Sequence, residues 1–165
     1  MTALPIARHR FVERLGTSLE EARREGHRVA LFLVGVDRSS GCIASLEPDA
    51  AESLVRRICE RLARCAGDRG EPALLRPGEF AVVVPRFRNG AQLREAAARM
   101  LATVRFSYRA SIGIAIFPAD GTRPGALLGC AAIALAAARR EGRHSYSFYL
   151  PFLAATSAAS SPPDL

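Results

Sequence analysis

Charged side chains stand at the ends of several predicted elements of this chain. Asp37 follows an apolar run at 29–36, and Glu79 follows a Pro-Gly turn between two apolar segments. Arg139 and Arg143 lie four residues apart, a spacing that places both on one face of a helix. Carboxylates can bind cations and guanidinium groups can bind anions, so the fold decides whether these side chains act together.

The pattern of apolar residues predicts the elements that must position these side chains. Helical spacing predicts helices around 11–22, 51–62, 93–101 and 124–140. Apolar or alternating runs predict strands at 29–36, 73–75, 81–84, 105–117 and 145–149. The wholly apolar run 29–36 is typical of a strand buried on both faces, so we expect it near the centre of a sheet. Gly26 and Gly142 should end the first and last helices. This order predicts an α/β sandwich.

The composition fits one compact domain. The chain has 165 residues, 49% of them hydrophobic, which is enough for a sheet covered by helices on one face. Apolar stretches are broken well before the roughly 18 residues that a membrane span needs, and the N-terminus lacks a signal pattern, so we expect a cytoplasmic protein without membrane insertion. The cysteines show no metal-binding spacing, and we expect them to be reduced and mostly buried. They are Cys42, Cys59, Cys65 and Cys130.

The net charge of +7 comes entirely from arginine, because the chain contains no lysine. A basic balance can indicate a polyanionic partner. Here the arginines are scattered along predicted helices with glutamates between them, and the few aromatic residues fall in predicted strands. This pattern does not favour a nucleic-acid partner.

Several runs carry a resemblance to a known family. The hairpin tip reads Arg76-Pro77-Gly78-Glu79-Phe80 before an apolar strand. The run at 110–115 reads Ala-Ser-Ile-Gly-Ile-Ala, and Phe-Pro-Ala-Asp-Gly follows it at 117–121. In order and spacing, from Arg10 to Tyr149, the chain resembles the GGDEF family of diguanylate cyclases, whose turn reads Gly-Gly-Asp/Glu-Glu-Phe. The resemblance implies a central mixed five-stranded sheet flanked by helices, of nucleotide-cyclase type with a ferredoxin-like core.

The resemblance also implies which positions carry the chemistry. In this family, two GTP molecules in facing subunits condense into cyclic di-GMP, and carboxylates at the end of the first strand and at the hairpin tip hold Mg²⁺. These two positions fall at Gly35 and Gly78, which have no side chain to bind a metal. The family's guanine-reading Asn falls at Ile43, which cannot pair with a base edge. The resemblance therefore predicts that Mg²⁺ binding and cyclase activity are lost.

Two carboxylates survive near these positions. Asp37 lies on the same face of the strand as Gly35 but about 6.6 to 6.8 Å further on, which misses a ligand sphere of roughly 2 Å. Glu79 points to the opposite face from residue 78 if the strand has already begun there. We expect neither carboxylate to be a metal ligand.

Other residues leave alternatives open. Arg76 could attract phosphate, whereas Pro77 removes a backbone donor. Arg139 and Arg143 stand at the spacing of the family's phosphate-binding Lys and Arg, but they could equally be a solvated helix end whose charge complements the helix dipole. Glu52 falls where the family reads the base, yet it also fits an ordinary acid in the first turn of a helix.

We therefore expect a degenerate GGDEF domain that does not make cyclic di-GMP. The expected organisation is a lead-in helix at 1–27, the degenerate domain at 28–150 and a flexible tail at 151–165. Met1 and the tail favour a short complete protein. The leading hypothesis is a regulatory or protein-interaction module in a cyclic di-GMP pathway of bacterial signal transduction, possible as a homodimer. The alternatives are a non-catalytic sensor of GTP or cyclic di-GMP and, last, a residual cyclase.

Overall fold

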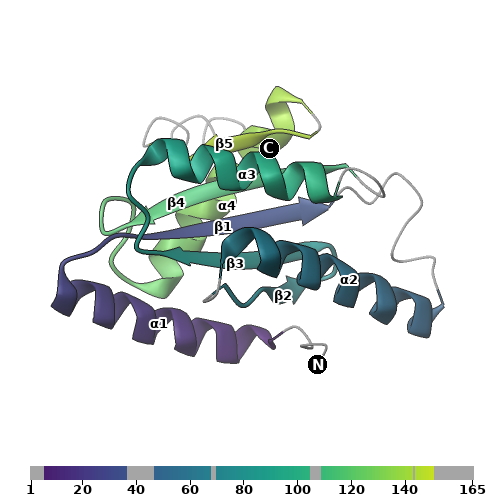
Figure 1. The fold of residues 1–165 in the computed structure, drawn as a ribbon, viewed down its shortest axis with the longest axis horizontal. Coiled ribbons are helices and arrows are strands. Elements are labelled where there is room, and N and C mark those ends of the chain that lie inside the picture. Colours follow the sequence, from purple (N-terminus) through teal and green to yellow (C-terminus); the bar gives the residue numbers. More distant parts are fainter. Residues whose placement is uncertain (1–5, 37–46, 68–69, 105–108, 143, 151–165) are drawn as a thin grey trace, which may run out of the picture.

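The computed structural model describes residues 6–36, 47–67, 70–104, 109–142 and 144–150. In chain order, its elements are α1 (Arg8–Glu25), β1 (Val29–Val36), α2 (Pro48–Ala66), β2 (Ala73–Arg76), β3 (Glu79–Pro85), α3 (Gly90–Val104), β4 (Ala110–Phe117), α4 (Pro124–Glu141) and β5 (Tyr146–Phe148) (Figure 1). The expected tail and most of the segment that follows β1 lie outside the described residues.

The strands form one mixed sheet in the order β2-β3-β1-β4-β5. β1 pairs antiparallel with β3 on one side and with β4 on the other, and β2 pairs antiparallel with β3. β5 pairs parallel with β4 at the edge of the sheet. The predicted central position of 29–36 is confirmed, because every residue of β1 is buried and both of its edges are paired.

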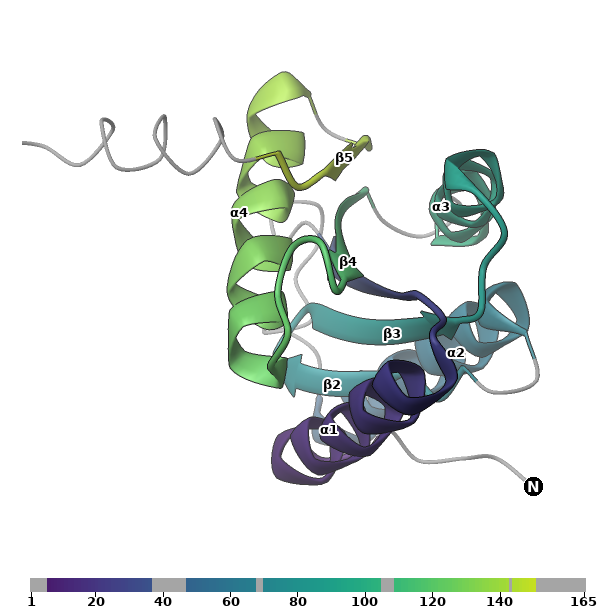
Figure 2. The same ribbon diagram turned by 90° about the vertical axis from the view of Figure 1, so that its left-hand side faces the viewer.

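Helices cover both faces of the sheet, which confirms the expected sheet flanked by helices. α1 and α4 pack on the face that carries Leu31 and Leu33 of β1, through residues such as Leu15 and Leu135. α2 and α3 pack on the opposite face. Figure 2 looks along the sheet and shows α4 on one side and α2 and α3 on the other. Alternate residues of β1 point to opposite faces, so a wholly apolar strand requires a core on each side.

The helices begin and end at the glycine and proline residues that the sequence predicted. Gly26 ends α1 with a φ of 70°, a left-handed conformation that favours glycine. Pro48 and Pro124 stand at the first positions of α2 and α4, where a missing N–H costs nothing. β4 begins at Ala110, and most of its predicted amino-terminal extension lies outside the described residues. Within the described ranges, no helix is long and apolar enough to cross a membrane.

A close contact between the backbones of α4 and β4 positions this helix on the sheet. A Cβ atom on Gly113 of β4 would lie 2.8 Å from the Cα atom of Leu135, and nearer still to the Ala131 carbonyl oxygen and the Leu135 nitrogen. No side chain fits there, so the glycine lets the helix backbone rest against the strand. Leu135 is thereby fixed above the middle of the sheet.

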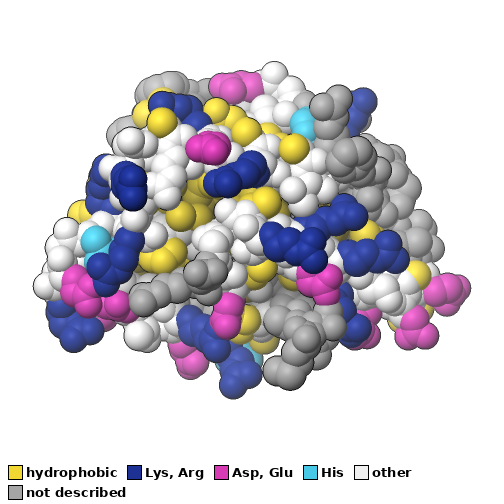
Figure 3. All heavy atoms as spheres, in the orientation of Figure 1, with side chains coloured by type: hydrophobic (Ala, Val, Ile, Leu, Met, Phe, Trp, Pro, Cys, Tyr) yellow, Lys and Arg dark blue, Asp and Glu magenta, His cyan; other side chains and the backbone are white. Residues whose placement is uncertain are grey.

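Arginines and acidic residues alternate over the surface shown in Figure 3 and do not form one basic stripe. Many are paired, as in the contacts between Arg23 and Glu20 and between Arg56 and Glu52. Of the described cysteines, Cys59 is buried and Cys65 and Cys130 are half-buried, and none forms a disulfide. Burial raises the pKa of the Cys59 thiol to about 12, so this residue is chemically inert near neutral pH.

Candidate functional site

Three neighbouring strands bring candidate site positions together at one end of the sheet. Gly35, near the carboxyl end of β1, lies opposite Glu79 of β3 and opposite Ser111 of β4. Residues that face each other in an antiparallel ladder point to the same face of the sheet, so these positions share the face that α4 covers. Ser111 is 5% exposed and is a buried polar residue that we did not predict as part of the site. In the sequence, the only indication of this position was that Ser111 belongs to the family-like run at 110–115.

The signature hairpin has the predicted two-residue turn at Pro77 and Gly78. Gly78 is buried and has a φ of 78°, which glycine adopts without strain. Its carbonyl accepts a hydrogen bond of 2.8 Å from the Val36 nitrogen, which ties the hairpin tip to the end of β1. The turn therefore sits where the resemblance places the hairpin's metal ligand, but it offers only backbone atoms there.

Glu79 opens β3 and points toward the α4 face, alongside Gly35. Its side chain is 15% exposed, and its Oε2 atom lies 3.7 Å from the Nε atom of Arg76. The carboxylate that survives from the signature is therefore already engaged with an arginine from the other arm of the hairpin.

Arg139 fills the space beside Gly35. A Cβ atom placed on Gly35 would lie 3.0 Å from the Cζ atom and 3.3 Å from the Nε atom of Arg139, and nearer still to one terminal nitrogen. The guanidinium thus occupies the volume that a side chain at position 35 would need. The geometry of the helix and the sheet explains this contact. Leu135 of α4 lies against Gly113 of β4, which pairs with Leu33 of β1. Arg139 lies one helical turn after Leu135 and Gly35 lies two residues after Leu33, so the two residues meet.

These residues do not fit a magnesium ion. Of the three paired strand positions, only Glu79 carries a carboxylate, and Arg76 already contacts it. Mg²⁺ needs hard oxygen ligands in near-octahedral geometry, whereas Arg139 brings a fixed positive charge to the same end of the sheet. The donor set therefore disagrees with the metal that the family resemblance implies.

Other predicted site residues are not brought to this place. Glu52 is exposed in α2, on the opposite face of the sheet, and forms an ion pair of 2.9 Å with Arg56. It lies in the second turn of α2, so the expectation of an acid in the first turn was wrong; Asp49 holds that place. A base-reading role of Glu52 remains a prediction.

The expected pairing of Arg139 and Arg143 on one helical face stays a prediction. α4 ends at Glu141, and Gly142 follows it as the predicted stop. Arg143 itself, with Asp37 and Ile43, lies outside the described residues.

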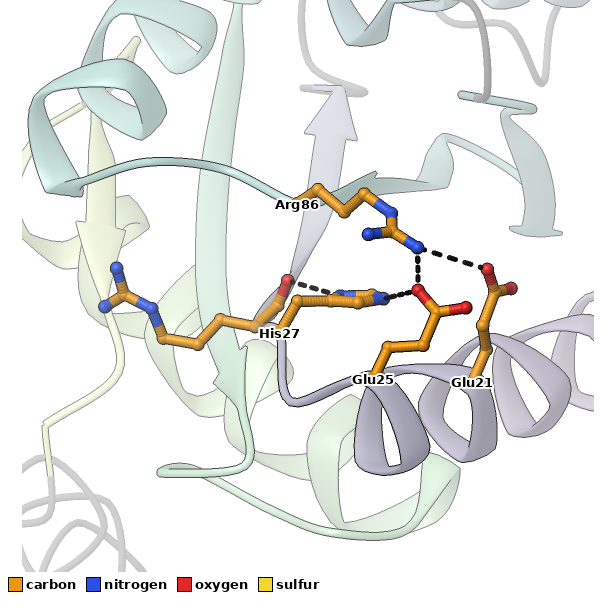
Figure 4. A network of polar contacts seen from close by, with 5 residues as sticks. Glu21, Glu25, His27 and Arg86 are labelled. Carbon is orange, nitrogen blue, oxygen red and sulfur yellow. Dashed lines mark hydrogen bonds and ion pairs between the residues drawn. The ribbon is translucent and has the colours of Figure 1, made fainter.

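A second polar cluster lies at the opposite end of the sheet, and sequence analysis did not find it. Arg86, after β3, hydrogen-bonds to Glu25 and lies 3.5 Å from Glu21 of α1, and the Nε2 atom of His27 lies 3.9 Å from Glu25 (Figure 4). Arg86 adopts a φ of 55°, a region that few non-glycine residues enter. The i, i+4 spacing of the two glutamates was the available signal, but their partner is distant in sequence.

This cluster also has the residue types of a metal site, because ligand atoms of Glu21, Glu25 and His27 lie within 4.8 Å of one another. The hydrogen bond from Arg86 lowers the pKa of the Glu25 carboxyl and raises that of Arg86. The arginine thus supplies the positive charge that the two carboxylates require, and we assign no ion to them.

The chain belongs to the GGDEF family, because the family model for the diguanylate cyclase GGDEF domain matches residues 1–145. It is 28% identical over 155 residues to the diguanylate cyclase TpbB of Pseudomonas aeruginosa PAO1, a match that covers 88% of this chain and 35% of TpbB. The chain therefore spans about a third of the length of this curated relative.

Solved structures agree with this assignment. A structure comprising only the GGDEF domain of TpbB, also called YfiN, from P. aeruginosa matches with a TM-score of 0.84 and 25% identity, covering 95% of this chain and 96% of that one. The diguanylate cyclase SiaD of P. aeruginosa, solved with its activator SiaC, matches with a TM-score of 0.77 and 22% identity, over 89% of this chain and 59% of SiaD. The SiaD match shows a shared fold. The predicted family and sheet are thus confirmed.

Proposed function

We propose that this chain is a catalytically inactive GGDEF domain that acts as a regulatory or protein-interaction module in cyclic di-GMP signalling. The observation that carries the proposal is the contact between Arg139 and Gly35. Where the resemblance places a metal-binding carboxylate, the chain has a glycine, and a guanidinium occupies the adjoining space.

The chemistry supports the loss of activity. Phosphoryl transfer depends on positioning and on stabilising charge at the transferred group, and the metal supplies most of that charge. Gly35 and Gly78 offer no side-chain ligands, and the carboxylate of Glu79 is engaged with Arg76. Removing one preorganised charged group typically costs about 10²- to 10³-fold in kcat, and here two are absent.

A protein partner is the leading role for such a domain. The structure of SiaD with its activator SiaC is an example of a diguanylate cyclase held in a complex with another protein. By analogy, we propose that this chain exerts its effect through protein contacts or through association with a second GGDEF domain. Fold analogy supplies the class of interaction and does not identify the partner.

A non-catalytic nucleotide sensor is the second candidate, and the position of Arg139 favours it. Arg139 and Arg76 both approach the end of the sheet where the resemblance places the phosphates. A sensor would bind GTP or cyclic di-GMP without converting it. Replacing Arg139 and Arg143 together by alanine would abolish nucleotide binding in a sensor and would leave a protein-interaction module able to hold its partner.

The test of inactivity is product formation from labelled GTP with Mg²⁺, with a diguanylate cyclase of demonstrated activity as the control. We expect no cyclic di-GMP from this chain under conditions in which an active control turns over. Formation of labelled cyclic di-GMP that scales with the concentration of this chain would overturn the proposal in favour of a residual cyclase.

A further inference from the structure

We propose that the groove between α1 and the outer edge of β3 binds a short, extended, apolar peptide of a partner protein, which adds to the sheet beside Val83. The groove gives the proposed protein-interaction module a surface and a class of partner, so the inference rests on the proposed function. Val83 lies in the half of β3 that is remote from the hairpin turn, and the surface is therefore distinct from the strand ends around Gly35.

β3 is longer than the strand beside it. β2 begins at Ala73, which lies opposite Ala81, and Pro72 precedes it. Proline is confined to the edges, starts and bulges of sheets, so its position fits the end of regular pairing here. Among the described strands, none pairs with β3 beyond Ala81 on this side. Residues 83–85 therefore form a free edge of the sheet.

The backbone of Val83 points toward this free edge. On the inner side of β3, the Arg86 nitrogen donates to the carbonyl of Arg28. At the other end of the strand, the Gly78 carbonyl accepts from the nitrogen of Val36. Hydrogen-bonding direction alternates along a strand, so even-numbered residues pair with β1 and odd-numbered residues face outward. No described residue pairs with the outward N–H and C=O of Val83, which an added strand can use.

An apolar hollow of about 450 Å³ adjoins this backbone. Its lining includes Phe11 and Leu15 of α1 and Val83 and Pro85 of β3, and Val83 packs on the α1 face of the sheet. Ligand pockets typically have volumes of about 300 to 1,000 Å³. In an added antiparallel strand, the side chain opposite Val83 would point to the same face and enter the hollow. The site thus combines main-chain pairing with a pocket for one apolar side chain.

The charged residues around the hollow are already paired within the protein. Arg14 forms an ion pair with Glu71 across the groove. Arg86 is paired with Glu25 and lies 3.5 Å from Glu21 (Figure 4). An occupant therefore meets balanced charges, and burying an unpaired charge of its own would be costly. This balance favours an uncharged peptide.

The test is an NMR titration of the full isotope-labelled chain with end-blocked pentapeptides that carry threonine at the outer positions and leucine, valine, phenylalanine or aspartate at the centre. We expect the apolar peptides to shift the Val83 amide signal and to slow its hydrogen exchange, and the aspartate peptide to have no effect. Failure of every apolar peptide to affect Val83 at millimolar concentration would overturn the inference.

A backbone-methylated probe tests the main-chain pairing in the unaltered protein. Methylation of the central backbone nitrogen removes the donor that the Val83 carbonyl would accept, so we expect the affinity to fall by about 10-fold or more. Equal binding of the methylated and unmethylated peptides would contradict strand addition.

Matched variants of α1 locate the site. Ser18 lines the hollow, so Ser18→Trp should fill it and abolish peptide binding. Glu13→Trp puts the same side chain on an exposed position of α1 outside the lining and should leave the affinity nearly unchanged. Equal losses in both variants, each with a melting temperature near that of wild type, would place the peptide elsewhere and overturn the inference.

The same measurements separate other occupants and the proposed function. Dimerisation of the chain alone that Ser18→Trp abolishes would assign the groove to a second copy and overturn the inference. Absence of both peptide binding and cyclic di-GMP formation would overturn the inference and leave the inactive module standing. Labelled cyclic di-GMP made from GTP and Mg²⁺ would overturn the proposed function, whether or not a peptide binds.

Discussion

The two ends of the central strand hold arginines in opposite circumstances. At the amino end of β1, Arg86 is held by Glu21 and Glu25 of α1. At the carboxyl end, Arg139 lies on a bare glycine, and no described carboxylate pairs with it. Each guanidinium group lies near one end of β1, but of the two only that of Arg86 is balanced by described carboxylates.

This difference indicates how the two ends are used. A paired arginine links two elements, and Arg86 joins the lead-in helix to the far end of the hairpin strand. Arg139 is exposed and has no described acidic partner, so its charge remains accessible. The comparison therefore indicates a structural role for Arg86, whereas a phosphate-binding role for Arg139 remains a prediction.

The largest effect should come from disturbing the contact that positions α4. Gly113→Val places a side chain into the backbone of Ala131 and Leu135, so we expect a loss of about 3 kcal/mol or more in the free energy of unfolding. Urea unfolding measures this change. Gly129→Ala is the control in the same helix: nothing lies within 4 Å of its Cβ, and it should stabilise the domain by about 0.5 to 1 kcal/mol. A tolerated Gly113→Val would contradict the described packing.

Gly35→Asp sharpens the comparison by giving Arg139 the acidic partner that Arg86 already has. The guanidinium would hold the new carboxyl's pKa below the unfolded value of about 3.9. The resulting stabilisation, about 1 kcal/mol relative to Gly35→Asn, should be present at pH 7 and lost as the pH falls through the folded-state pKa.

Melting temperatures of the two Gly35 variants at pH 7 and pH 3 measure this effect. If Asp and Asn behave alike at both pH values, Arg139 does not stand beside position 35.

The smallest effect should come from Arg86→Gln at the other end of β1. Glu25 has a lowered pKa because Arg86 hydrogen-bonds to it, so the interaction stabilises the fold above the unfolded pKa of the carboxyl and is lost as the pH falls through the lower folded value. The groups are exposed, so we expect only a small drop in melting temperature at pH 7 and none at pH 3. If the chain is a nucleotide sensor, its GTP affinity should not change; a loss comparable to that of Arg139→Ala would remove the distinction between the two ends.

The sequence predicted those features that depend on local pattern. The spacing of Phe11, Leu15 and Leu19 predicted the buried face of α1, and the apolar run 29–36 predicted a central strand. The turn at Pro77-Gly78 follows from the backbone preferences of these two residues. The loss of side-chain ligands at Gly35 and Gly78 was also visible, once the resemblance had aligned these positions with the family.

The features that the sequence did not predict depend on contacts between distant segments. The contact of Arg139 with Gly35 requires α4 to approach β4 at Gly113, which no local pattern encodes. The same holds for Arg86, whose partners precede it by a whole strand and helix.

The central claim is that this end of the sheet holds a guanidinium instead of a metal ion, and paramagnetic NMR with Mn²⁺ tests it most directly. Mn²⁺ bound at the strand ends would broaden the backbone amide signals of Gly35 and Gly78, whereas Gly26, near Glu25 at the opposite end, reports on the second acidic cluster. The account predicts that equimolar Mn²⁺ leaves the Gly35 and Gly78 signals intact. Selective broadening of these two signals would contradict the account, because it would place a metal where the structure has Arg139.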